Sequence, residues 1–408
     1  MWLALAIFAF TWLLVLGTKI PGVPLDRPSG AATGAVLMVA FGVVTPAEVY
    51  REAIHHETLV LLLGMMILCA YLAEAGFFRW ASWQAIHAAK TPRRLLAGVT
   101  LICAALSALL VNDTVCLMVT PLVLQVVDDA DLPPLPYLLA VAFGANAGSA
   151  ATPTGNPQNM IVATLSGLTF SEFTLSLAPA ALAATLVVLG VLLVLFRDEL
   201  RARPLAVSHV APPPVDRALL ARAVGTLAAV AIAFVAGADL AWTAMAGAAL
   251  LLAIGGRPPR QALERVDWVL LLFFAGLFVV IHGVGKSGAA DAMFAAISPW
   301  ITGGPWWEMA VFGTATVVLS NLFSNVPFVL LAANWIPSFS DPGLAWKVLA
   351  LTSTLAGNLT IVGSVANVIV FEAAGSRGAI SFGRFLRFGL PVTALGTLVG
   401  TLALLLLR

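Results

Sequence analysis

Long runs of apolar residues dominate this chain and limit what it can fold into. Such runs cover, among others, residues 59–75, 180–196, 268–281 and 395–407. A helix that crosses a membrane needs about 20 apolar residues, whereas a soluble domain carries roughly 25% charged residues. Here only 10% of the 408 residues are charged and 61% are hydrophobic. Because the strands of an outer-membrane barrel give no such runs, we predict an all-α integral membrane protein.

We predict ten spans and two re-entrant hairpins, arranged as two halves with broken helices. The first half, residues 1–200, has spans near 2–17, 30–44, 58–77 and 174–196, a hairpin at 95–127 and a broken span at 135–165. The second half, residues 218–408, has spans near 219–236, 241–255, 267–285 and 382–407, a hairpin at 308–335 and a broken span at 346–371. A hydrophilic linker at 201–217 with three consecutive prolines separates the halves.

Polar interruptions recur in the same order in both halves. Asn112 and Asn325 occupy the two predicted hairpin tips and are 213 positions apart. Asn159 and Asn367 follow a glycine in the two broken spans and are 208 positions apart. The difference is about the size of one loop insertion. Because each half has an odd number of spans, we expect two inverted-topology repeats, as in alternating-access transporters.

The basic residues predict the orientation of these repeats. Of the 21 Lys and Arg residues, only four fall on one side of the predicted topology, namely Arg51, Lys286, Lys347 and Arg408. Basic residues favour the cytoplasmic side of a membrane. We therefore expect a multi-pass protein of the plasma (inner) membrane, with both termini outside and the linker 197–217 in the cytoplasm. The first hairpin then enters from the cytoplasm and the second from outside.

Four polar breaks interrupt the apolar helices, at 112–114, 144–159, 324–325 and 357–367, and none of them contains Lys or Arg. Irregular backbone at membrane depth survives only inside the protein or along a wet cavity. Each break frees carbonyl groups for a cation and directs a half-helix N-terminus at an anion. We therefore predict a common substrate and ion site, with these candidate residues: Asn112, Asp113, Thr114, Gly155, Asn156, Asn159, Ser324, Asn325, Gly363, Ser364 and Asn367.

Asp113 is the most specific of these candidates. An acid inside the membrane is costly unless it is paired or used. It could take up a proton or bind a coupling Na⁺, or it could cap the second half-helix of its hairpin. Its counterpart in the second half is Val326, so such a role would be asymmetric. If Na⁺ is the coupling ion, we expect it at Asn112, Asp113, Asn159, Asn325 and Asn367.

Other chemistry finds little support in the sequence. The three cysteines, Cys69, Cys103 and Cys116, lie in apolar runs without disulfide or metal spacing. Cys116 fits a small apolar residue or a soft ligand for trivalent arsenic. The chain offers no nucleophile–base pair and no phosphate loop with lysine, so we predict no enzyme and no cofactor. A separate soluble ATPase partner stays open, and a net charge of +1 implies no nucleic-acid partner.

At these breaks the chain resembles the ion-transporter superfamily. That superfamily includes arsenite-pump membrane subunits, citrate–metal symporters, divalent anion–sodium symporters and one class of sodium/proton antiporters. The resemblance is carried by residues 111–121, 145–159, 324–327 and 363–367. It implies a scaffold domain, a mobile transport domain with elevator-like motion, and commonly a homodimer. The dicarboxylate symporters share a Ser-Asn-Thr tip in both halves, and this chain departs from that pattern toward the arsenite-pump and anion-permease branches.

The sequence therefore favours a secondary active transporter of a small anion or oxyanion, coupled to H⁺ or Na⁺, in a lipid bilayer. Three alternatives stay open. A Na⁺/H⁺ antiporter would need no anion, an arsenite or antimonite efflux permease would move a metalloid, and an ion channel would have a continuous pore.

Overall fold

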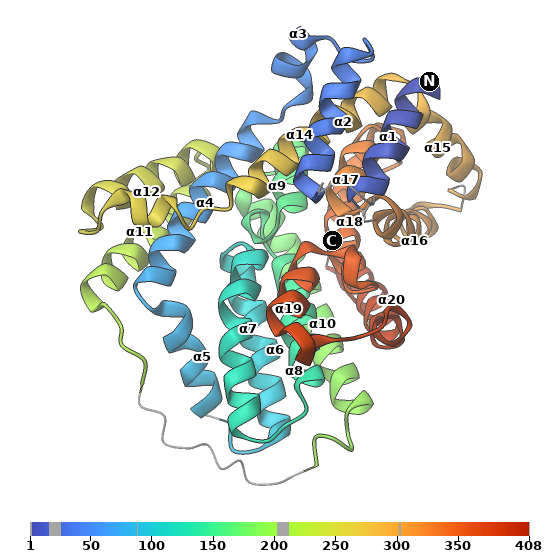
Figure 1. Cartoon of the computed structure of the whole chain (residues 1–408). Helices are drawn as coiled ribbons and strands as arrows, with labels where there is room; N and C mark the ends of the chain where they lie inside the picture. The colour runs from blue at the N-terminus through green and yellow to red at the C-terminus, as the bar shows by residue number, and fades with distance from the viewer. Residues whose placement is uncertain (1, 16–25, 88, 202–211, 302, 408) are drawn as a thin grey trace.

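The computed structural model describes residues 2–15, 26–87, 89–201, 212–301 and 303–407 (Figure 1). Every regular element within these ranges is helical, which confirms the predicted all-α class. The first half contains α1 (Trp2–Val15), α2 (Arg27–Ala40), α3 (Pro46–Glu48), η1 (Val49–Ala53), α4 (His56–Glu74), α5 (Phe77–His87), α6 (Pro92–Leu109), α7 (Asn112–Asp129), α8 (Pro134–Ser149), η2 (Pro153–Gly155), α9 (Pro157–Ser166) and α10 (Phe170–Leu195).

The second half follows the same order of long and short elements. It contains α11 (Arg217–Val235), α12 (Leu240–Ile254), α13 (Pro259–Leu263), α14 (Trp268–Lys286), α15 (Ala289–Ile297), η3 (Ser298–Trp300), α16 (Pro305–Phe323), α17 (Asn325–Ala333), η4 (Ile336–Ser338), α18 (Pro342–Ala356), η5 (Ile361–Gly363), α19 (Val365–Ala374), η6 (Gly375–Gly378) and α20 (Phe382–Leu406). The predicted linker lies outside the described residues at 202–211, as do residues 16 and 17 of the first predicted span.

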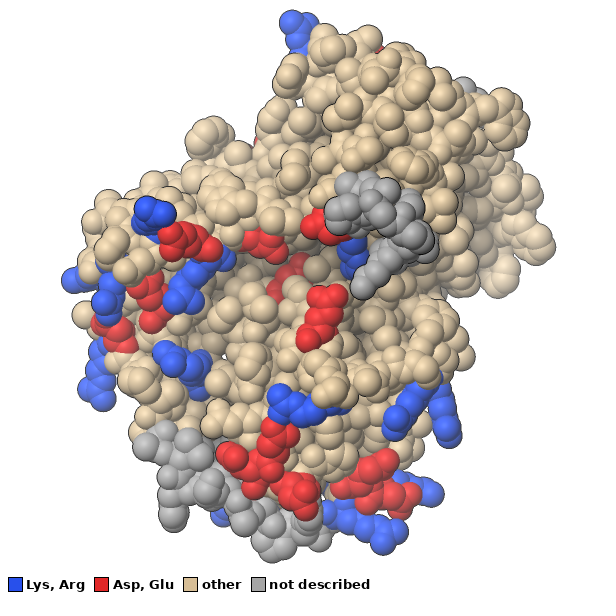
Figure 2. Space-filling model, viewed as in Figure 1, with Lys and Arg blue, Asp and Glu red and all other residues tan. Residues whose placement is uncertain are grey.

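Six helices in the described part of the chain are long and apolar enough to cross a membrane, namely α4, α6, α10, α11, α14 and α20. Every other predicted span and hairpin also coincides with helices, but these are shorter or broken, so the count of ten spans stays a prediction. In Figure 2, charged side chains gather toward the lower and left parts of the view, whereas the upper part is almost uniformly uncharged. A surface without charge is what contact with lipid requires.

Besides the short α3 and α13, two longer helices were not expected from the sequence. α5 and α15 occupy stretches that the sequence analysis treats as connections after a span. Each follows a span within three residues and precedes a hairpin, so both connect the outer spans to the hairpin helices. They are short and partly polar, which is why no apolar run revealed them.

The two halves interlock rather than forming separate bodies. α4 of the first half packs against α12 of the second, and α2 packs against α14. Helices of opposite halves also meet near the centre, where α7 contacts α19 and α9 contacts α17. Figure 1 shows α4, α11 and α12 together on the left, with α5 to α8 below them. Every residue of α8 from Pro136 to Ser149 is buried, so this helix lies in the middle of the packing.

Close helix packing depends on glycine at the contact between α6 and α8. A Cβ atom on Gly148 would lie 2.1 Å from the carbonyl oxygen of Ala104, and one on Gly144 would lie 2.7 Å from that of Thr100. Two glycines four residues apart let helix backbones approach each other closely, as in other membrane helix pairs. The contact holds the arm of the first hairpin against the broken span.

We therefore predict that Gly148→Ala destabilises the protein by about 1–3 kcal/mol, because the added methyl group collides with backbone that cannot rotate away. Thermal unfolding of the purified protein in detergent measures this effect. Gly190→Ala on α10 is the matched control, since nothing lies within 4 Å of that position. Equal unfolding temperatures for the two variants would contradict the proposed tight contact.

Candidate functional site

The tips of both hairpins are tight interruptions in otherwise continuous helix. α6 ends at Leu109 and α7 begins at Asn112, with Leu110 and Val111 in extended conformation between them. α16 ends at Phe323 and α17 begins at Asn325, so the second tip is a single residue, Ser324. Ser324 has φ 67° and ψ 156°, a region that costs a residue with a side chain about 1–3 kcal/mol.

The broken spans supply two further helix starts. α8 is followed by the single turn η2 and restarts as α9, and α18 is followed by η5 and restarts as α19. Together with the hairpin tips, this gives four helix N-termini near one another. α7, α17 and α19 lack a side-chain cap, whereas Asn156 caps α9 by accepting from the amide of Asn159 at 2.8 Å.

A small cavity lies among these four helix starts. The volume of this cavity is about 30 Å³, enough for one or two waters. Polar residues from both hairpin tips and both broken spans line it, together with an apolar wall from α14: Asn112, Asp113, Pro157, Gln158, Phe273, Phe274, Leu277, Ser324, Asn325, Val326, Gly363, Ser364 and Val365. A buried N-terminus without a cap needs a partner for its free N–H groups, so this cavity suits acceptor oxygens.

A network of buried amides behind the cavity fixes which atoms face it. Asn367 Nδ2 donates to the carbonyl oxygens of Gly357 at 2.6 Å and Thr360 at 2.9 Å. Because carbonyl oxygens only accept, the orientation of this amide is settled, and its Oδ1 accepts from Asn146 Nδ2 at 3.0 Å. Asn146 Oδ1 then accepts from Asn112 Nδ2 at 3.2 Å. Asn112 is the last side chain in this series, and its Oδ1 has no hydrogen-bond partner.

The first broken span carries a matching network. Asn159 Nδ2 donates to the carbonyl oxygens of Ser149 and Thr152, both at 3.1 Å. Its Oδ1 accepts from the hydroxyl of Thr354 on α18 at 3.3 Å. Ser149, Thr152 and Asn159 stand 208 positions before Gly357, Thr360 and Asn367. In each half, one asparagine thus donates to the carbonyl groups of its own broken helix. The side-chain oxygen of the same asparagine accepts a hydrogen bond from the other half.

The cavity is electrostatically unusual for a membrane interior. Asn112 Oδ1 and Asn325 Oδ1 are both buried without a hydrogen-bond partner. Asp113 is only 8% exposed, and no Lys, Arg or His is among the residues that line the cavity. Buried polar atoms are almost always paired, so two unpaired acceptors beside a carboxyl group indicate a place for a bound solute or cation.

The structure brings some predicted residues into the cavity and places others around it. Asn112, Asp113, Ser324, Asn325, Gly363 and Ser364 line the cavity. Asn156, Asn159 and Asn367 belong to the buried amide networks behind it. Gly155 allows close contact, because a Cβ there would lie 2.2 Å from the carbonyl oxygen of Ser149. Thr114 is half-buried on α7 and does not line the cavity.

Several residues of the site were missed by the sequence analysis. Asn146 links the two halves, and a signal for it existed, since it is an amide inside a helix of small apolar residues. Gln158 lines the cavity beside the predicted Asn159. The wall made by Phe273, Phe274 and Leu277 had no signal, because these residues lie within an uninterrupted apolar run. The described residues contain no cluster of three His, Cys, Asp or Glu suited to a metal.

Comparison with known proteins gives a consistent family. The family model described as citrate transporter matches residues 5–356. The silicon efflux transporter LSI3 of Oryza sativa subsp. japonica is 31% identical, over 96% of this chain and 95% of that protein. A 46 kDa membrane protein of Mycobacterium leprae is 32% identical, over 96% of this chain and 95% of its own. The putative transporter arsB of Dictyostelium discoideum is 28% identical, over 92% and 87%.

Solved structures show the same fold at low sequence identity. The Alcanivorax borkumensis YdaH transporter superposes with a TM-score of 0.57 at 16% identity, covering 99% of this chain and 96% of that one. MtrF of Neisseria gonorrhoeae, described as illuminating a class of antimetabolite efflux pumps, gives 0.55 at 12% identity, covering 98% and 94%. Two of the three sequence relatives are named as transporters and the third as a membrane protein, in agreement with the predicted superfamily. This chain therefore belongs to the citrate transporter family and is a multi-pass membrane transporter.

Proposed function

We propose that this chain is a secondary active transporter of a small oxyanion or its protonated acid, coupled to H⁺ or Na⁺. The observation that carries the proposal is the small cavity in which two unpaired amide oxygens and one carboxyl group meet three uncapped helix N-termini. The helix N-termini provide N–H donors and positive dipoles. The amide oxygens accept hydrogen bonds. A solute with both acceptor oxygens and hydroxyl groups satisfies both sets.

The size of the cavity narrows the substrate class. A cavity volume of about 30 Å³ suits a solute of a few heavy atoms rather than a tricarboxylate. The relative named for silicon efflux and the relative named arsB support this choice for the chain, because silicon and arsenic oxyacids are small and rich in hydroxyl groups. An arsenite or antimonite permease is one member of this substrate class, and the direction of transport would then be efflux.

Asp113 is the proposed coupling residue. It is the one charged residue that lines the cavity. A carboxylate there would repel an oxyanion unless it carries a proton or sits beside a cation. Uptake of H⁺ or Na⁺ together with the solute removes this repulsion, and the free oxygens of Asn112 and Asn325 are suitable ligands for Na⁺. Coupling to an ion gradient needs no soluble ATPase partner.

The transport mechanism we propose is alternating access by two inverted repeats. The mirrored pairs α2–α14 with α12–α4, and α7–α19 with α17–α9, support this. So do the hydroxyl groups of Thr152 and Thr360, 208 positions apart, which tie each broken span to its hairpin at Ala108 O and Asn321 Oδ1. Elevator-like motion, a homodimer, a plasma-membrane location and termini on the outside belong to the same proposal, and the basic residues support the orientation.

Experiments can distinguish two alternative functions from the proposed one. A Na⁺/H⁺ antiporter is favoured by the carboxyl group of Asp113 together with the two free amide oxygens of Asn112 and Asn325, and it predicts Na⁺ flux that no oxyanion changes. A channel requires a continuous water path, whereas the side of the cavity formed by α14 is lined by the apolar residues Phe273, Phe274 and Leu277. A channel would also conduct far faster than a carrier turns over.

A ligand panel tests the substrate class. We expect arsenite, orthosilicic acid, phosphate or sulfate to raise the unfolding temperature of the purified protein, while citrate and succinate do not, because ligands that bind the folded state stabilise it by mass action. Each ligand is measured with and without Na⁺. Stabilisation by citrate alone would contradict the small-solute proposal, and stabilisation by Na⁺ alone would favour the antiporter.

A pair of asparagine variants separates solute binding from helix bracing. Asn325→Ala removes an unpaired oxygen, so we expect an unchanged unfolding temperature without ligand and the loss of ligand-induced stabilisation. Asn367→Ala leaves the carbonyl groups of Gly357 and Thr360 unpaired, so we expect destabilisation of about 2–5 kcal/mol. The exposed Gln125→Ala on α7 is the control. Equal destabilisation by both asparagine variants would argue against a ligand role for Asn325.

Substitution of the acid tests the coupling. We expect Asp113→Asn to abolish solute transport driven by a pH or Na⁺ gradient in proteoliposomes while the protein still folds, because the amide neither titrates nor carries charge. Asp129→Asn, at the exposed end of the same helix, is the control. Wild-type gradient dependence in Asp113→Asn would remove this residue from the coupling mechanism.

A further inference from the structure

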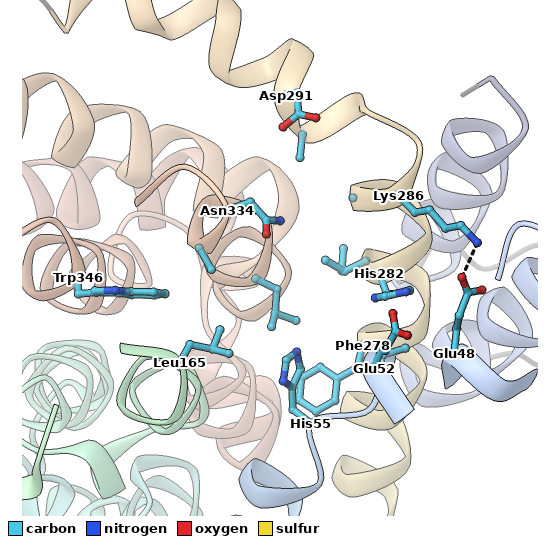
Figure 3. Close-up of a pocket in the computed structure, with 16 residues that line it drawn as sticks. Glu48, Glu52, His55, Leu165, Phe278, His282, Lys286, Asp291, Asn334 and Trp346 are labelled. Carbon is cyan, nitrogen blue, oxygen red and sulfur yellow. Dashed lines mark hydrogen bonds and ion pairs between the residues drawn. The ribbon is translucent and has the colours of Figure 1, made fainter. Parts of the chain in front are cut away.

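A second, larger basin lies on the side of the molecule where α4 begins and α14 ends (Figure 3). Its volume is about 760 Å³. One wall comes from α3, η1 and α14, and the opposite wall comes from α9, α17 and α18. Charged and titratable side chains stand on or above the first wall: Glu48, Glu52, His55, His282, Lys286 and Asp291. Leu165, Asn334 and Trp346 face them from the other side.

The basin and the central cavity lie along the same two helices. On α14 the cavity is lined up to Leu277, and the basin is lined by the next residue, Phe278, and by Ile281 one turn further along. On α17 the cavity is lined by Val326 and the basin by Leu330. Four residues of helix advance about 6 Å. The partition between the two spaces is therefore no thicker than about one helical turn on either helix.

Aromatic rings form this partition. Phe278 is 1% exposed, and its ring lies beside that of Phe274, with centroids 6.5 Å apart, so the pair connects the floor of the basin to the wall of the cavity. His55, just before α4, meets the ring of Phe278 edge-on at 5.1 Å and 89°. Figure 3 shows His55 and Phe278 in contact at the bottom of the basin. An edge-to-face pair of this kind holds both rings in place.

Burial keeps the imidazole of this brace uncharged, and an ion pair ties together the helices beside it. Lys286 donates to Glu48 at 2.6 Å, which ties α3 to the end of α14 and lowers the pKa of Glu48 to about 2. Burial, followed by the charges of His282 and His56, lowers the pKa of His55, so its imidazole is neutral at neutral pH and packs against the phenyl ring. Glu52 and Asp291 are exposed to the water of the basin.

We propose that the basin is the vestibule through which the solute passes between the central cavity and one face of the membrane, and that Phe278, braced by His55, is the gate between them. This inference rests on the proposed role of the central cavity as a solute site. In the predicted topology the vestibule opens to the outside. Movement of α17 relative to α14 would open the one-turn partition without unfolding either helix.

Thiol accessibility tests the gate independently of transport. Val326→Cys places a reporter in the central cavity, where Val326 is 5% exposed. The three native cysteines are buried and are replaced by alanine in the test background. We expect a membrane-impermeant methanethiosulfonate reagent, added on the side of the α14 C-terminus, to label this reporter slowly. With Phe278→Ala added, the labelling rate should rise at least tenfold, and with His55→Ala severalfold.

Phe312→Ala on α16 is the matched control, because Phe312 is equally buried, packs against Phe339 with centroids 4.5 Å apart, and lines neither space. An equal rise of the labelling rate in this control would overturn the gate. So would an unchanged labelling rate in both Phe278→Ala and His55→Ala. His55 is only half-buried, so its variant keeps the test valid if Phe278→Ala fails to fold. Accelerated labelling without any response in the ligand panel would sustain the gate and overturn the proposed substrate instead.

Discussion

The pairing of buried asparagine amides with the carbonyl groups of broken helices is the interaction on which this structure depends. Unwound backbone inside a membrane has no water to satisfy it. Asn159 and Asn367 each donate to two such carbonyl oxygens, so the breaks survive as ordered structure. Because those carbonyl groups only accept, they also settle the orientation of each amide. Asn146 passes this constraint across the interface between the halves to Asn112.

The same constraint separates structural from functional polarity. An amide that donates to two carbonyl groups and accepts from a neighbour has no N–H donor left for a solute. Asn112 and Asn325 each keep a free oxygen, and the hairpin tips bring both to one cavity. The uncapped starts of α7, α17 and α19 add donors of the opposite kind. A site without basic side chains can therefore suit an oxygen-rich solute, and Asp113 is the one charged residue that lines it.

Much of this arrangement could be predicted from the sequence, because membrane helices need apolar runs and the site needs to interrupt them. The hairpins and broken spans fell where Asn, Gly and Ser replaced apolar residues. α5 and α15 escaped prediction, since helices that only connect spans need no apolar run. The role of Asn159 could not be separated from that of Asn112 in advance. Both are asparagines at breaks, and only their carbonyl neighbours, which depend on tertiary packing, distinguish them. The aromatic wall of α14 likewise depends on which face of that helix meets α17.

The backbone of Ser324 has a consequence for the empty carrier. Its positive φ angle is a conformation that glycine adopts freely and serine does not, at an expense of about 1–3 kcal/mol. An arrangement of the second hairpin in which this angle relaxes would, with other contacts equal, be populated roughly tenfold to a hundredfold more. Within the proposed transport cycle, a solute bound at this tip would have to offset the cost of the distortion. Release of the solute would then favour departure of the second hairpin from this conformation.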